Sequence, residues 1–123
     1  LYEQYKKVLR LATRDEAFRQ GKFFDLMYVN LNNARLDANR VYAFMRVAGE
    51  SSFLVVCNFS DYEGQVGINI PQHALDYLQL DAGSYFTQDL LSGRHDHLVL
   101  SAQEQATVHL EPWSAAVLRL NKQ

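Results

Sequence analysis

Cysteine is almost missing from this chain of 123 residues, and its single copy, Cys57, excludes an internal disulfide and any multi-cysteine metal site. A strong excess of one charge is missing too, because charged residues make up 21% of the chain and the net charge is −2. That balance argues against a disordered chain or a polyanion binder. No apolar run approaches the roughly 18 residues of a membrane span. We therefore expect no nucleic-acid partner and no membrane segment, and the sequence leaves the compartment open.

Hydrophobic residues make up 48% of the chain and aromatic residues 12%, which is enough for the core of one domain. The first of them have helical spacing. Tyr2, Tyr5, Val8 and Leu9 repeat at i, i+3 and i+4, which predicts a helix over Leu1–Ala12 with one apolar stripe. The basic residues on its other side alternate with acidic ones, as on a solvated helix face.

From Lys22 onward the pattern changes to short β-rich runs separated by turn residues. The predicted strands are Lys22–Val29, Arg40–Val47, Phe53–Phe59, Val66–Ile70, Ser84–Leu91, Leu98–Leu100, Ala106–Leu110 and Ser114–Leu120. The stretch 72–80 fits either a short helical turn or an irregular loop. About eight strands with close turns predict an all-β fold, an antiparallel β-sandwich of Greek-key type. Phe53–Phe59 is apolar on both faces, as expected at the centre of a covered sheet.

The opening helix is unusual for such a fold. A sandwich already covers its own sheets, so a single preceding helix needs another apolar surface to pack on. We therefore expect that the helix belongs to a neighbouring domain, and that the chain is part of a longer polypeptide.

Five segments, in order along the chain, carry a family resemblance. They are Leu1-Tyr2-x-x-Tyr5-Lys6-x-Val8-Leu9-x-Leu11, Val41-Tyr42-Ala43-Phe44-Met45-Arg46, Phe53-Leu54-Val55-Val56-Cys57-Asn58-Phe59-Ser60, Asp89-Leu90-Leu91-Ser92-Gly93 and Leu110-Glu111-Pro112-Trp113-Ser114-Ala115-Ala116-Val117-Leu118. Together they resemble the end of α-amylase-family glycoside hydrolases (family 13). One departure is Glu16, which stands where that family commonly has proline in the turn after the helix.

The resemblance implies two parts: residues 1–21 as the last helix of a catalytic (β/α)₈ barrel with its linker turn, and residues 22–123 as the C-terminal β-sandwich domain. The helix face of Tyr2, Tyr5, Val8 and Leu9 would make the contact with the barrel. It further implies a non-catalytic accessory domain that stabilises a parent enzyme acting on α-glucans. The motifs that carry the family's catalytic Asp and Glu do not occur here. We expect no catalytic residue, cofactor or metal in this chain. We expect the catalytic barrel to be its partner, with an α-glucan as a further candidate.

Exposed aromatic rings can stack on the apolar faces of sugars. Tyr62 and Trp113 are the two candidates, although packing in the core or at the barrel interface is the simpler expectation for both. If both are exposed and coplanar, an autonomous carbohydrate-binding module becomes the alternative function. A generic adhesion-type sandwich would explain the strands but not the opening helix.

Other polar features have plainer interpretations. His95 and His97 would share a strand face but lack a third metal ligand, so a solvated loop is expected. His73 and His109 have no evident partner. Cys57 is predicted to be a buried core thiol, and the glycosylation sequon at Asn58 is better explained as a strand end.

Overall fold

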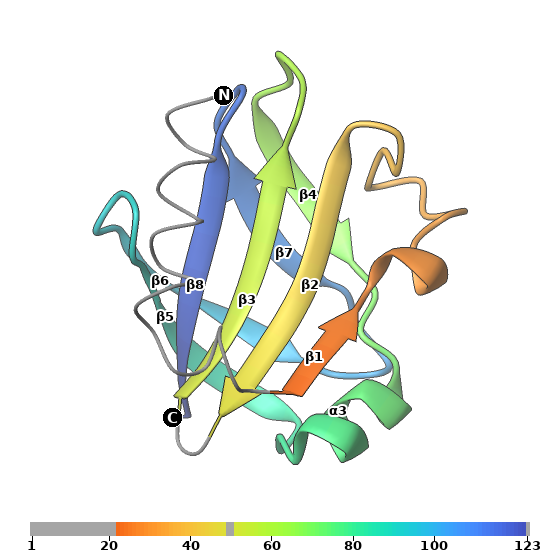
Figure 1. Ribbon diagram of the computed structural model, residues 1–123, viewed down its shortest axis with the longest axis vertical. Coiled ribbons are helices and arrows are strands. Elements are labelled where there is room, and N and C mark those ends of the chain that lie inside the picture. The colour runs from red at the N-terminus through yellow and green to blue at the C-terminus, as the bar shows by residue number, and fades with distance from the viewer. Residues whose placement is uncertain (1–21, 49–50, 123) are drawn as a thin grey trace.

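Figure 1 shows the computed structural model, which describes residues 22–48 and 51–122. Its elements are β1 (Lys22–Asp25), the 3₁₀ turn η1 (Met27–Val29), β2 (Val41–Ala48), β3 (Ser51–Asn58), β4 (Gly64–Ile68), α3 (Gln72–Leu78), β5 (Gly83–Asp89), β6 (His95–Leu100), β7 (Ala106–Leu110) and β8 (Ala115–Lys122). The predicted helix Leu1–Ala12, with its contact residues Tyr2, Tyr5, Val8 and Leu9, lies outside the described residues.

The strands form two sheets, and every pairing is antiparallel. The larger sheet has the order β1-β2-β3-β8-β5-β6, and the smaller one pairs β4 with β7. In Figure 1 the β4–β7 pair lies behind the larger sheet, so the molecule has two layers. The predicted all-β antiparallel fold of about eight strands is confirmed. Strand β8 lies between β3 and β5, although it comes last along the sequence.

The main core fills the space between the two sheets. Leu54 and Val56 of β3 meet Ile68 of β4 and Leu110 of β7 there, and all four side chains are essentially inaccessible to solvent. Because side chains alternate along a strand, every second residue of β3 points into this space. Each such buried aliphatic side chain contributes about 1.5–3 kcal/mol to folding.

The other face of the larger sheet is also apolar. Phe53 and Val55 of β3 and Val117 of β8 alternate with the core residues and form a second cluster, which is fully buried. We call this side the outer face. Its residues on β1, β2, β3 and β8 include Phe23, Tyr42, Phe44, Arg46, Phe53, Val55, Cys57, Val117 and Arg119. The expectation that the third strand is apolar on both faces is confirmed.

The first strand is shorter than predicted. It ends at Asp25, whose carboxylate accepts a hydrogen bond of 2.7 Å from the Met27 backbone N–H, and the chain then turns into η1. The side chain of Asn30, fully buried, next donates to the Leu26 and Asn69 carbonyl oxygens. These side-chain contacts satisfy backbone groups that a strand would have paired, so the predicted strand Lys22–Val29 was wrong beyond its first half.

One further segment differs from its predicted structure, and another shows which of two predicted structures is present. Residues 95–97 of the predicted loop 94–97 instead begin β6, because His95 pairs with Gln88 and His97 with Phe86 of β5. As an edge strand, β6 needs no apolar face at this end, and His95 and His97 are both exposed. The stretch 72–80 contains the short helix α3.

Candidate functional site

A row of aromatic and guanidinium side chains crosses the outer face over four strands. The antiparallel register places Phe23, Arg46, Phe53 and Arg119 directly opposite one another on β1, β2, β3 and β8. The Arg46 guanidinium lies 5.0 Å from the centre of the Phe23 ring, and that of Arg119 lies 5.4 Å from Phe53. At these distances the cations are attracted by the ring faces.

In the adjacent row on the outer face, Phe44, Val55 and Val117 lie directly opposite one another on β2, β3 and β8. The ring of Phe44 lies 5.3 Å from that of Phe23 and 5.7 Å from that of Tyr42, which extends the apolar surface to the edge of the sheet. Phe23 is still 41% exposed. The outer face therefore combines a dry centre with an open aromatic edge.

Cys57 also belongs to the outer face. It is half-buried and packs against the cluster of Phe53, Val55 and Val117. Burial raises the pKa of its thiol from 9.0 to about 11. A thiol with so high a pKa holds almost no nucleophilic thiolate at neutral pH, which agrees with the predicted non-nucleophilic role. The predicted burial in the core is met only in part, because Cys57 is half-buried on the outer face.

Asn58 joins the two turns at one end of the sandwich. Its amide nitrogen donates to the carbonyl oxygens of Tyr62 (2.8 Å) and Glu111 (3.0 Å), while its oxygen accepts from the Ser60 N–H (3.2 Å) and hydroxyl (2.7 Å). The side chain is fully buried. This asparagine thus fixes the β3–β4 turn against the β7–β8 turn.

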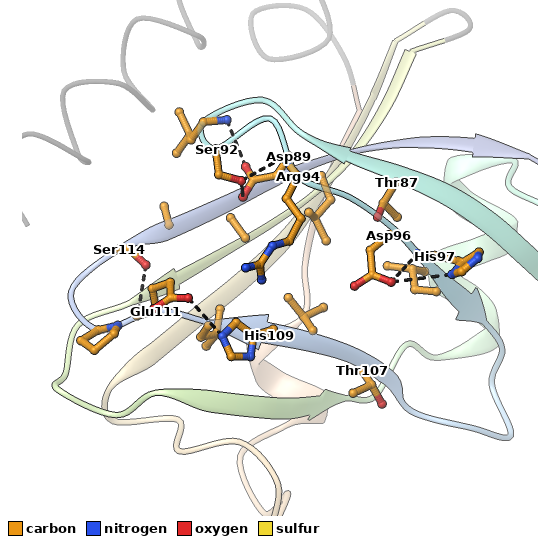
Figure 2. A pocket seen from close by; sticks show the side chains of 18 of the residues that line it. Thr87, Asp89, Ser92, Arg94, Asp96, His97, Thr107, His109, Glu111 and Ser114 are labelled. Atoms are coloured by element: carbon orange, nitrogen blue, oxygen red, sulfur yellow. Dashed lines mark hydrogen bonds and ion pairs between the residues drawn. The ribbon is translucent and has the colours of Figure 1, made fainter.

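The described residues line a groove of about 400 Å³ at the corner where β6 approaches β7. Figure 2 shows Arg94 reaching into it from one side, and His109 and Glu111 facing it from the other. Polar side chains from the β5–β6 hairpin line one wall, and β7 with the following turn lines the other. We call this hollow the corner groove.

Trp113 lies at one end of the corner groove, in the turn between β7 and β8. It is 47% exposed and has a left-handed backbone, with φ of 52°. Bulky residues rarely adopt this conformation, which costs roughly 1–2 kcal/mol. Its backbone N–H donates to the Ser60 carbonyl at 2.8 Å, and the Ser114 hydroxyl donates to the Glu111 carbonyl at 2.7 Å. Those bonds hold the turn that presents the indole beside the groove.

The groove wall offers both donors and acceptors. His109 Nε2 lies 3.2 Å from a Glu111 carboxylate oxygen, and His97 Nδ1 lies 3.7 Å from Asp96. Asp89 is already engaged, because its carboxylate accepts bonds from the Leu91 and Val117 N–H groups and the Ser92 hydroxyl.

The two predicted stacking residues are both exposed, but in different surroundings. Tyr62 is 47% exposed, and its hydroxyl donates to the Gln65 carbonyl at 3.1 Å. Trp113 lines the corner groove, whereas Tyr62 is not among its lining residues. Trp113 was expected to pack in the core or at the barrel interface. Its 47% exposure excludes the core, and packing at the barrel interface stays a prediction. Sequence reasoning also missed the pairing of His109 with Glu111, for which the i, i+2 spacing on one strand was the available signal.

Comparison with known families identifies the chain's relatives. The family described as "Alpha amylase, C-terminal all-beta domain" matches residues 31–121. No curated protein matches the chain significantly. Of the described helices, none has the length and hydropathy of a membrane span.

Solved structures of several α-amylase-family enzymes share the fold, and three of them illustrate the similarity. An α-amylase of Anoxybacillus has a TM-score of 0.60 and 16% identity, and the match covers 98% of this chain and 22% of the amylase. A maltogenic α-amylase of Thermotoga neapolitana has a TM-score of 0.65 and 10% identity, and the match covers 99% of this chain and 26% of the amylase. An isomaltulose synthase mutant of Erwinia rhapontici has a TM-score of 0.53 and 21% identity, and the match covers 96% of this chain and 17% of the synthase. The chain spans about a quarter or less of each. With the family match over most of its length, the chain belongs to the C-terminal all-β domains of the α-amylase family.

Proposed function

We propose that this chain is a non-catalytic accessory domain of an α-amylase-like glycoside hydrolase that acts on α-glucans. In this proposal, residues 22–123 are the domain, and residues 1–21 are the last helix and linker of the catalytic barrel. The domain packs on the barrel through its outer face and stabilises it.

One observation carries the proposal: the larger sheet is apolar on both faces. The β4–β7 sheet covers only the inner face, where Leu54 and Val56 lie. The outer face holds Phe53, Val55 and Val117 at its dry centre and ends in the exposed ring of Phe23. A sandwich that worked alone would carry polar residues there, as antiparallel sheets do on their solvated side. The predicted helix stripe of Tyr2, Tyr5, Val8 and Leu9 is the proposed cover from the barrel.

Truncation of the full-length enzyme after residue 21 tests the proposal. We expect a lower melting temperature and reduced activity on a maltooligosaccharide. An enzyme that kept both would overturn it.

A finer test uses the aromatic edge of the outer face. Phe23→Ser should cost about 1 kcal/mol more in the full-length enzyme than in the isolated chain, because docking buries the rest of its ring. Leu31→Ser is the matched control, since Leu31 is 64% exposed and lies in the loop after η1. Equal losses for Phe23→Ser in both contexts would contradict contact through this face.

A second candidate function, a carbohydrate-binding module, is supported by Trp113. A half-exposed indole beside a groove with mixed donors and acceptors is suited to stacking on a sugar ring. Calorimetric titration of the chain with maltoheptaose should then give saturable heat that is lost in Trp113→Ala and kept in Tyr62→Ala. The two variants should differ because Trp113 lines the groove and Tyr62 does not. Absence of heat at millimolar sugar would leave the domain with its packing role alone.

A further inference from the structure

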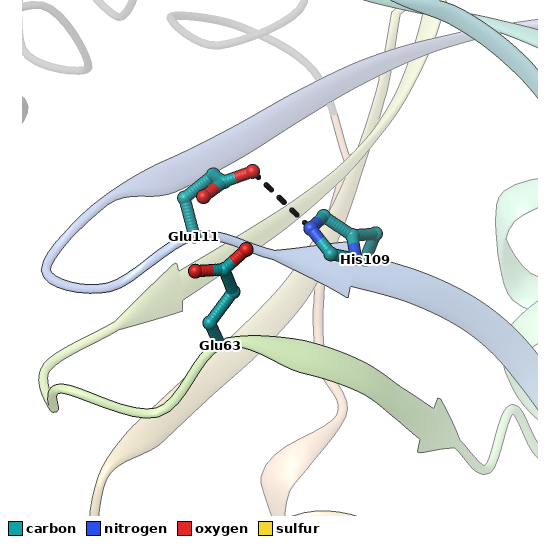
Figure 3. A group of neighbouring side chains, drawn as sticks. All are labelled: Glu63, His109 and Glu111. Carbon is teal, nitrogen blue, oxygen red and sulfur yellow. Dashed lines mark hydrogen bonds and ion pairs between the residues drawn. The ribbon is translucent and has the colours of Figure 1, made fainter.

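Three potential metal ligands converge at the end of the β4–β7 pair. The register pairs Gly64 with Leu110 and Gln65 with His109. Continued by one residue, it places Glu63 opposite Glu111. His109 and Glu111 are two residues apart, so their side chains leave the same face of the ladder. Figure 3 shows the three side chains on that face, with Glu63, just before β4, pointing toward His109 of β7 and Glu111, which follows β7.

Their ligand atoms are close enough to share one ion. One ligand atom from each of Glu63, His109 and Glu111 lies within 4.8 Å of the others, and His109 Nε2 is 3.2 Å from a Glu111 oxygen. The two carboxylates are exposed and the imidazole is half-buried. An ion can therefore reach the three atoms from solvent without opening the fold.

Within the part of the chain that the structure describes, no lysine or arginine forms an ion pair with this cluster. Within residues 22–48 and 51–122, the carboxylate of Glu63 makes no ion pair or hydrogen bond, and that of Glu111 meets only His109. Like charges directly opposite each other on paired strands destabilise the pair. A divalent cation between the two carboxylates would reverse that repulsion.

The backbone under the cluster is rigid. The buried Asn58 side chain holds the carbonyl oxygens of Tyr62, which precedes Glu63, and of Glu111 itself. Two of the three ligands are thus tied to one amide group, and the third lies on a paired strand. Metal sites benefit from such fixed supports, because little ordering is left to be done on binding.

We propose that Glu63, His109 and Glu111 bind one divalent transition-metal ion of the Zn²⁺ type, with its remaining coordination position open to solvent. One imidazole nitrogen and two carboxylate oxygens suit Zn²⁺, which takes three protein ligands and an open fourth position in many sites. Ca²⁺ and Mg²⁺ prefer all-oxygen sites and are disfavoured by the imidazole. The expectation of a domain without metal is revised by this proposal, which does not rest on the proposed packing or sugar-binding role.

The test is calorimetric titration of the full 123-residue chain with ZnCl₂ in a buffer that does not chelate metals. We expect saturable binding of one ion, weakened at least about tenfold by His109→Ala and by Glu63→Gln, since even indirect supports of a metal site are worth that much. The double variant His95→Ala/His97→Ala is the matched control, because it removes the two exposed imidazoles of β6 and should leave this binding unchanged.

Three results of the ZnCl₂ titration would overturn the proposal. They are no saturable binding at millimolar Zn²⁺, binding that survives both His109→Ala and Glu63→Gln, and binding that is lost only in the β6 double variant. Far-UV circular dichroism of each metal-free variant confirms that it is folded. Since Glu63→Gln replaces an exposed carboxylate by an amide of the same shape, this variant keeps the test decisive even if His109→Ala unfolds the chain. Equal affinity for CaCl₂ would also contradict a site selected by its nitrogen ligand.

Discussion

Replacement of Asn58 by alanine should be among the most damaging single changes in the domain. The side chain is fully buried and makes four hydrogen bonds, two to carbonyl oxygens of the adjoining turns and two to Ser60. At about 1 kcal/mol for each bond, Asn58→Ala should lower the free energy of unfolding by about 4 kcal/mol. That is a large part of the roughly 5–15 kcal/mol typical of a whole domain.

Urea unfolding followed by far-UV circular dichroism measures this loss. With a slope of about 2 kcal/mol per molar, the midpoint should fall by about 2 M. Asn39→Ala is the control, because Asn39 is exposed in the loop before β2 and its removal should change little. A loss below about 1 kcal/mol for Asn58→Ala would refute the assignment of this amide as the link between the two turns.

Asn58→Asp separates hydrogen bonding from packing, since it keeps the volume but replaces the two N–H donors by a carboxylate. The new group would face the carbonyl oxygens of Tyr62 and Glu111 while buried, so its pKa in the folded state is expected above the unfolded value of about 3.9. The variant should therefore be most stable below about pH 4 and lose stability as the pH rises through the folded pKa. Wild-type stability over the same pH range is the reference. A variant as stable as the wild type at pH 7 would show that the donors contribute nothing.

Three other predictions concern Cys57 and Trp113. Because burial raises the pKa of the Cys57 thiol from 9.0 to about 11, alkylation by iodoacetamide at pH 8 should be about 100-fold slower in the folded chain than in urea, and equal rates would contradict its burial. The same shift adds stability that is complete below pH 9 and is lost as the pH rises toward 11, which pH-dependent urea unfolding measures. Trp113→Gly should be more stable than Trp113→Ala by about 1 kcal/mol in thermal unfolding, because glycine adopts the left-handed backbone at φ of 52° without strain. If the alanine variant were the more stable, the strain argument at this turn would be wrong.

The sequence was most informative where burial leaves a repeating pattern. The run from Phe53 to Phe59 predicted a central strand with two apolar faces, and β3 has them. It was least informative where polar side chains replace that pattern. Asp25 ends β1 by accepting a backbone hydrogen bond, and no hydropathy pattern records such a bond. The start of β6 looked like a loop, because His95 and His97 pair along a sheet edge that faces water.

The candidate sites depend on contacts between residues far apart in the chain. Glu63 and Glu111 become neighbours only through the register of β4 on β7, which local sequence does not specify. The corner groove likewise needs the β5–β6 hairpin beside β7. Trp113 was assigned to packing because large aromatic residues are usually buried. It is exposed because its turn has a left-handed backbone, and the residues of that turn do not indicate this conformation.

The central position of β8 has a consequence for how the domain forms during synthesis. The larger sheet consists of β1-β2-β3 on one side and β5-β6 on the other, and β8 alone hydrogen-bonds to both. Until residues 115–122 have left the ribosome, the two parts have no strand between them, and the inner edges of β3 and β5 are unpaired. Such unpaired edges can form hydrogen bonds with strands of other chains until β8 occupies them. The nascent domain is therefore exposed to strand mispairing until β8 has formed.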